Sequence, residues 1–171
     1  MKHGFIKVAA ISPKIKVADP AYNAGVIVEK MKEAYEKGAK ILVFPELCIT
    51  GYTCGDLFLQ EILLEEAKRQ LSVIAEATQD MDALVMVGLP VEREGRLYNV
   101  AAVLHQGSVL GMVPKSNLPM YGEFYEGRHF TEGNTVPVSY DFEEEEVPFG
   151  RNLLFECNSM PGLVIGCELC E

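Results

Sequence analysis

The spacing of apolar residues alternates between a period of two and a period of three to four along the first half of the chain. Wholly apolar runs there are typical of strands covered on both faces, and two helical stripes separate the strands. Asp19-Pro20 supplies an N-cap and a first-turn proline for the first helix, which Gly38 is expected to end. The predicted elements are strands at 4–11, 41–44 and 83–88, with helices beginning at Pro20 and spanning about 56–78. This β-α-β-α-β order implies a layered α/β fold with parallel neighbouring strands and right-handed crossovers.

The second half of the chain has a different pattern. Residues 97–104 and 109–113 are predicted to form a hairpin that turns at Gln106-Gly107-Ser108. The stretch 114–134 has no regular period and carries charged and aromatic residues, and a loop of that length in a compact domain is usually functional. The acidic run 143–146 is interpreted as a solvated surface turn. The last predicted strands are 153–155 and 163–167, with Cys167 expected to be buried in the second.

The composition narrows the class of protein and its environment. Of the 171 residues, 49% are hydrophobic, which excludes a disordered chain, and no charge-free stretch reaches the roughly 20 residues that a membrane helix needs. Fifteen basic against twenty-five acidic residues give a net charge of −10, which argues against nucleic acid and membranes as partners. The N-terminus does not have the pattern of a signal peptide, and five scattered cysteines fit reduced thiols. We therefore expect a cytoplasmic globular protein.

Three polar side chains each follow an apolar strand. Glu46 comes directly after the run 41–44, Lys115 follows the strand at 109–113, and Cys170 follows the last apolar run. Ligands of α/β sheets gather at the carboxyl ends of strands, where a buried charge needs a partner or a task. A base, a cation and a thiol at such an edge could form a catalytic constellation.

Several segments around these residues match the motifs of a known enzyme family. The chain resembles the nitrilase, or carbon–nitrogen hydrolase, superfamily, and within it the N-terminal glutaminase domain of the glutamine-dependent NAD synthetases. The narrower match rests on the run 51–58, Gly-Tyr-Thr-Cys-Gly-Asp-Leu-Phe, because Phe-Pro-Glu alone would not be specific. The matching segments are 44–58, 114–119, 123–126 with Arg128, 147–150 and 168–171.

The resemblance implies both a fold and a reaction. The fold is a nitrilase-type αββα sandwich, and the reaction is hydrolysis of the glutamine side-chain amide through a thioester. Glu46 would act as general base, Cys170 as nucleophile, and Lys115 with the backbone N–H of Glu171 as stabilisers of the oxyanion. Softer assignments are Glu123, as a second carboxylate orienting the lysine and the substrate, and three glutamine-pocket aromatics. These aromatics are Tyr52, Tyr121 and Phe124, whereas Arg128 and His129 receive no role.

The resemblance also implies a longer protein than these residues. Residues 1–171 correspond to part of a glutaminase domain, so we expect an incomplete sandwich, with the apolar residues Leu163, Ile165 and Leu169 uncovered and the isolated chain inactive. The released ammonia would serve a C-terminal synthetase domain, absent here, that converts nicotinate adenine dinucleotide to NAD with ATP and Mg. No cofactor is expected in residues 1–171, and the intact protein is expected to be a homo-oligomer.

Two other functions are compatible with parts of the sequence. A stand-alone amidase of the wider superfamily, acting on another amide, is disfavoured by the run 51–58. The Cys167-x-x-Cys170 pair also suggests a redox or metal module. It ends an apolar strand, however, rather than beginning a helix that would lower the thiol pKa, and Cys48 and Cys54 are too widely spaced to complete a typical zinc site.

Overall fold

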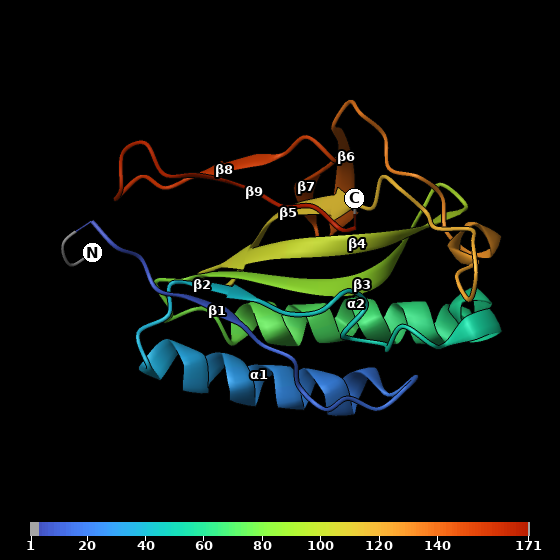
Figure 1. Ribbon diagram of the computed structural model, residues 1–171, viewed down its shortest axis with the longest axis horizontal. Coiled ribbons are helices and arrows are strands. Elements are labelled where there is room, and N and C mark those ends of the chain that lie inside the picture. The colour runs from blue at the N-terminus through green and yellow to red at the C-terminus, as the bar shows by residue number, and fades with distance from the viewer. Residues whose placement is uncertain (1–3, 171) are drawn as a thin grey trace.

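The computed structural model describes residues 4–170, in which a seven-stranded mixed sheet carries two helices on one face (Figure 1). The sheet order is β1-β2-β3-β4-β5-β7-β6, and β8 pairs with β9 in a separate two-stranded sheet. The strands of the large sheet are β1 (Val8–Ala10), β2 (Ile41–Val43), β3 (Leu84–Arg93), β4 (Arg96–His105), β5 (Ser108–Pro114), β6 (Val138–Phe142) and β7 (Glu145–Phe149). The small sheet consists of β8 (Leu154–Glu156) and β9 (Val164–Gly166). The parallel pairing predicted for the first three strands is confirmed.

The first helix, α1 (Pro20–Glu36), begins and ends where the sequence predicts. The Asp19 side chain accepts a hydrogen bond from the backbone N–H of Tyr22, and Pro20 occupies the first turn. Gly38 takes a positive φ of 86° just after the helix, a conformation in which glycine carries no steric penalty.

The predicted second helix is two elements rather than one. A short 3-10 helix, η1 (Gly55–Leu59), precedes α2 (Glu61–Glu76), and Gln60 between them has an extended backbone. Phe58 on η1 is buried in a second apolar cluster away from the main core, so the chain must change direction before α2 begins. Periodicity alone did not separate the two elements, because both contribute apolar residues at helical spacing.

The antiparallel half of the large sheet is more extensive than predicted. The hairpin of β4 and β5 is confirmed, but β3 continues to Arg93 and forms a second long hairpin with β4. The interpretation of 143–146 as a surface turn is half wrong. Glu143 and Glu144 do form a turn with positive φ, whereas Glu145 and Glu146 begin β7, whose Val147 and Phe149 are buried.

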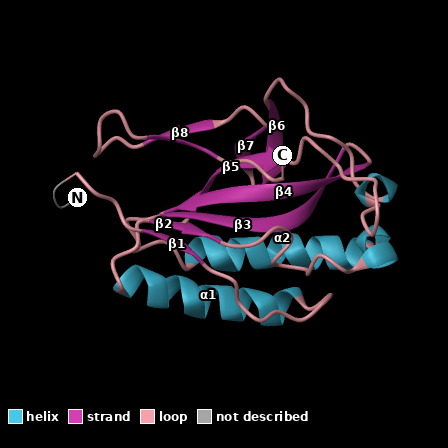
Figure 2. Cartoon of the chain, in the orientation of Figure 1, coloured by secondary structure: helices cyan, strands magenta, loops and turns pink. Residues whose placement is uncertain are grey.

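The C-terminal segment lies on the side of the large sheet opposite the helices (Figures 1 and 2). Both final strands are present, but Cys167 lies just beyond β9 and is half-buried, so its placement inside a strand was wrong. Leu169, expected to be uncovered, is only 7% exposed, and Leu163 and Ile165 are half-buried. The segment therefore folds back over the sheet instead of leaving these side chains in solvent.

The main hydrophobic core fills the space between the two helices and the large sheet. Ile27 and Met31 of α1 and Leu71 and Ile74 of α2 are fully buried against strands that include Leu42. Within residues 4–170, neither helix combines the length and apolar character required to cross a bilayer. The loops that follow the carboxyl ends of β2 and β5 carry the polar residues described next.

Candidate active site

Glu46 is held by the backbone around it. After β2 the chain turns tightly, and Leu47 adopts a positive φ of 52°, which is strained for a residue with a side chain. The turn lies directly on Gly88 of β3: a Cβ atom at Gly88 would be 2.3 Å from the backbone nitrogen of Leu47. The N–H of Ile49 also donates to the carbonyl of Gly88 at 3.1 Å. The backbone position of Glu46 is therefore set by contacts between main-chain atoms of the turn and β3.

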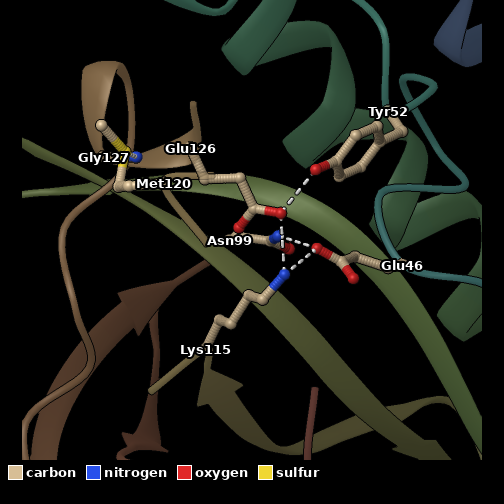
Figure 3. Close-up of polar contacts among 7 residues, drawn as sticks. All are labelled: Glu46, Tyr52, Asn99, Lys115, Met120, Glu126 and Gly127. Atoms are coloured by element: carbon tan, nitrogen blue, oxygen red, sulfur yellow. Dashed lines mark hydrogen bonds and ion pairs between the residues drawn. The ribbon is translucent and has the colours of Figure 1, made fainter. Parts of the chain in front are cut away.

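Lys115 is a buried ammonium between two carboxylates. It follows β5 directly, and its side chain is only 1% exposed. Its Nζ donates to Oε1 of Glu46 at 2.7 Å and to Oε1 of Glu126 at 2.8 Å (Figure 3). Burial lowers the pKa of Lys115, but the hydrogen bonds and charges of Glu126 and Glu46 outweigh it, so the net pKa is raised. The side chain is thus held in its cationic form.

Glu126 occupies the position that the sequence analysis assigned to Glu123. It lies on a short 3-10 helix, η2 (Glu126–Arg128), and its side chain is 5% exposed, whereas Glu123 is exposed. Two turns orient the segment: the N–H of Phe124 donates to Tyr121, and that of Phe130 donates to Glu126. The assignment of the lysine-orienting role to Glu123 was therefore wrong by three residues.

Asn99 is a site residue that the sequence analysis missed. It lies on β4, is fully buried, and donates a hydrogen bond from Nδ2 to Oε1 of Glu46 (Figure 3). Its backbone carbonyl also accepts the N–H of Lys115 at 2.8 Å. The signal in the sequence is a lone amide within an apolar strand, because a buried polar side chain needs a hydrogen-bonding partner.

The three predicted aromatics are divided between two places. The Tyr52 hydroxyl donates to Oε1 of Glu126 at 2.6 Å (Figure 3). Burial raises the pKa of Tyr52, and the carboxylates of Glu126 and Glu46 and the thiolate of Cys170 raise it further. Tyr121 and Phe124 instead stack edge to face on one another, with ring centroids 5.7 Å apart, and Tyr121 is mostly exposed. Their role in binding a substrate stays a prediction.

Cys170 is the last described residue and has a strained backbone conformation. Its φ is +53°, its thiol is free and exposed, and the preceding Leu169 anchors it by burial. Residues 167–169 line a polar cavity of about 350 Å³ together with Pro114 and Ser116, which flank Lys115. Within residues 4–170 no hydrogen bond joins the Cys170 thiol to Glu46, Lys115 or Glu126, so its membership of the site stays a prediction. The predicted oxyanion donor, Glu171, lies outside the described residues.

Arg128 and His129, left without a role by the sequence, dock the turn that carries Glu126. Arg128 pairs with the Asp56 carboxylate at 3.0 Å, and His129 Nε2 lies 3.1 Å from the same carboxylate. The pKa of Asp56 is lowered by these contacts, His129 first and Arg128 next. Phe58 packs edge to face on the His129 ring, with ring centroids 6.0 Å apart. The motif residues of η1 thus support η2 from the outside.

Comparison with known proteins places this arrangement in a family. The carbon–nitrogen hydrolase family model matches residues 7–171. The chain belongs to the carbon–nitrogen hydrolase family. It is 38% identical over 170 residues to a glutamine-dependent NAD(+) synthetase of Mycobacterium tuberculosis. The aligned region covers 99% of this chain and 25% of the relative. A synthetase of the same description from Thermotoga maritima is 33% identical over 138 residues, covering 81% of this chain and 23% of the relative.

Solved structures of the family confirm the predicted nitrilase-type α/β fold. A glutamine-dependent NAD(+) synthetase from Cytophaga hutchinsonii superposes with a TM-score of 0.84 at 31% identity, over 90% of this chain and 26% of that one. An amidase from Nesterenkonia sp. superposes with a TM-score of 0.63 at 24% identity, over 84% of this chain and 54% of that one, which is a likeness of fold alone. The chain spans about a quarter of the length of the curated relatives it matches.

Proposed function

We propose that this chain carries the Glu46, Lys115 and Cys170 triad of a glutamine amidohydrolase that works through a thioester. The observation that carries the proposal is the Lys115 ammonium, fully buried at a strand end and bonded to two carboxylates. A buried lysine with two acidic partners contributes little to the stability of the fold, because removing such charges from water is costly. A fixed cation between carboxylates has a clear catalytic use, because it can stabilise a thiolate and an oxyanion brought to it.

In the proposed reaction, Glu46 takes the proton of the Cys170 thiol and the sulfur attacks the carboxamide carbon of glutamine. Lys115 uses two of its three N–H groups on Glu46 and Glu126, which leaves the third for the negative oxygen of the tetrahedral intermediate. Collapse of that intermediate breaks the carbon–nitrogen bond as Glu46 returns the proton to the departing ammonia. Glu46 then activates a water molecule that hydrolyses the thioester and regenerates the thiol.

The ammonia is proposed to serve NAD synthesis. The relatives that match nearly all of this chain are glutamine-dependent NAD(+) synthetases, and this chain corresponds to about a quarter of their length. We propose that a synthetase domain elsewhere in the longer protein uses ammonia with ATP and Mg²⁺. The chemistry described above uses side chains and water only, so we propose no cofactor for the glutaminase step.

The test is the fate of glutamine in the full-length protein and its Cys170→Ala variant. We expect the variant to lose ammonia release from glutamine and glutamine-driven NAD formation, while ammonium-driven NAD formation stays near the wild-type rate. A matched Cys167→Ala variant should keep most glutamine hydrolysis, because that thiol is half-buried beyond β9. Hydrolysis that survives in Cys170→Ala, or equal loss of both NAD-forming activities, would refute the assignment. A panel of other amides distinguishes a glutaminase from a general amidase.

A further inference from the structure

Asn99 connects the two charged residues of the site. It lies on β4, the strand next to β5 in the sheet, and its side chain is fully buried. The Nδ2 amide donates to Oε1 of Glu46, and the backbone carbonyl accepts the N–H of Lys115 at 2.8 Å. One residue therefore contacts the side chain of Glu46 (Figure 3) and also the backbone of Lys115.

The amide of Asn99 is not explained by the stability of the strand. Its Oδ1 is buried and accepts no hydrogen bond from the described residues, whereas a satisfied structural amide would have partners for both ends. Asn23 shows the contrast: its side chain bonds the backbone of Lys16 in both directions and also donates to the carbonyl of Ile49. Among residues 4–170, the bond to Glu46 is the one hydrogen bond that the Asn99 side chain makes.

The two oxygens of Glu46 are consequently in different environments. Oε1 receives a hydrogen bond from Asn99 and another from Lys115, while Oε2 receives none from the described residues. The Glu46 side chain is 27% exposed, so one side of the carboxylate remains open. Lysine alone could bond either oxygen, since an ammonium is a compact charge on a flexible stem. The directed N–H of a buried amide removes that freedom.

We propose that Asn99 is a positioning residue that reserves Oε2 of Glu46 as the proton acceptor; this rests on the proposed role of Glu46 as general base. With Oε1 occupied by two donors, the basic lone pairs are those of Oε2. Among the described residues, the charged or titratable groups that contact Glu46 or its partners are Lys115 just after β5, Glu126 on η2 and Tyr52 after the Glu46 turn.

The experiment compares Asn99→Leu with Asn99→Asp and with Asn23→Leu as a matched control. Asn99→Leu removes the donor and the unpartnered Oδ1 together, so we expect its Tm to be unchanged or higher. Its kcat for glutamine should fall about tenfold or more, the usual effect of losing a hydrogen bond to a charged group, with little change in KM.

The two other variants distinguish positioning from stability. Asn99→Asp keeps the shape but replaces the donor with an acceptor, so it should lose activity at least as strongly as Asn99→Leu. Asn23→Leu breaks hydrogen bonds to the backbone and should lower Tm while kcat stays near the wild-type value at temperatures where the variant is folded. Wild-type kcat in Asn99→Leu would overturn the proposal.

A second readout is independent of turnover. Crystal structures of the wild type and of Asn99→Leu compare the orientation of the Glu46 carboxylate. We expect one orientation in the wild type and a rotated carboxylate or alternate conformers in the variant, because only the amide fixes which oxygen faces Lys115. An unchanged carboxylate would refute the positioning role even if the wild type proved not to hydrolyse glutamine, whereas a reoriented carboxylate with no glutaminase activity would refute only the proposed function.

Discussion

Replacing Gly88 with alanine tests whether the site depends on the turn that carries Glu46. An added Cβ would lie 2.3 Å from the backbone nitrogen of Leu47 and 2.8 Å from the carbonyl oxygen of Pro45. Ordinary contact begins near 3.4 Å, so the turn must move by at least 1.1 Å. No side chain can yield in its place, because the atoms met are backbone.

The expected losses follow from that displacement. A misplacement of about 1 Å in a catalytic group costs on the order of 100-fold in rate, so kcat for glutamine should fall by about that factor. Overpacking of a buried site costs about 1–3 kcal/mol, and the rigid neighbours here favour the upper end. For a domain of this size each kcal/mol lowers Tm by roughly 2–4 °C.

Gly111→Ala is the matched control. Gly111 is also a buried strand glycine, on β5, but a Cβ there would meet side-chain atoms of Leu153 and Phe155, at 2.9 and 3.1 Å. Those side chains can rotate, so we expect a smaller loss of stability and activity within a few-fold of the wild type. The assays are ammonia release from glutamine and thermal unfolding. A Gly88→Ala protein with near wild-type kcat would show that Glu46 does not depend on this backbone contact.

Three further predictions concern individual side chains of the site. Glu126→Gln should lower kcat at least tenfold, because Lys115 loses one of its two negatively charged partners. The exposed Glu123→Gln should not lower kcat in this way, and the reverse result in steady-state kinetics would restore the original assignment to Glu123. Lys115→Arg should lower kcat by about 100-fold or more, because a planar guanidinium cannot replace the ammonium between two carboxylates. Substantial turnover by this variant would contradict a role of Lys115 in stabilising the oxyanion. Tyr52→Phe should lower kcat by less than Glu126→Gln does, because it removes one hydrogen bond to Glu126 and no charge. Steady-state kinetics of the two variants test this order, and a larger loss in Tyr52→Phe would contradict it.

The sequence predicted best the elements that local chemistry determines. Asp19, Pro20 and Gly38 mark the ends of α1 through their own backbone preferences, and the structure confirms the helix. The hairpin of β4 and β5 follows from alternation and a glycine-containing turn. The pairing of β6 with β7 was missed because β7 begins with Glu145 and Glu146, which have a low strand preference. The burial of Val147 and Phe149 outweighs that preference.

The candidate site divides in the same way. Glu46 and Lys115 were recognisable as charges placed directly after apolar strands, and the structure joins them in an ion pair. The choice between Glu123 and Glu126 depended on how one irregular loop folds, which neither period nor spacing encodes. Asn99 was detectable in principle as an amide inside an apolar strand, but its partner was not, because Glu46 lies 53 residues away.

The order of the strands explains why Gly88 and Asn99 both belong to this site. β2 and β5 are separated in the sheet by β3 and β4, and three strand intervals of about 4.8 Å would place their ends roughly 14 Å apart. Glu46 and Lys115 nevertheless meet at 2.7 Å. The Glu46 turn lies on Gly88 of β3, where the absence of a side chain lets the backbone cross. Asn99 of β4 occupies the remaining interval and bonds Glu46 on one side and the Lys115 backbone on the other. Each intervening strand thus contributes a residue to the contact. A substitution at Gly88 should displace the proposed base from its cation, whereas one at Asn99 should leave the ion pair but free the orientation of the Glu46 carboxylate.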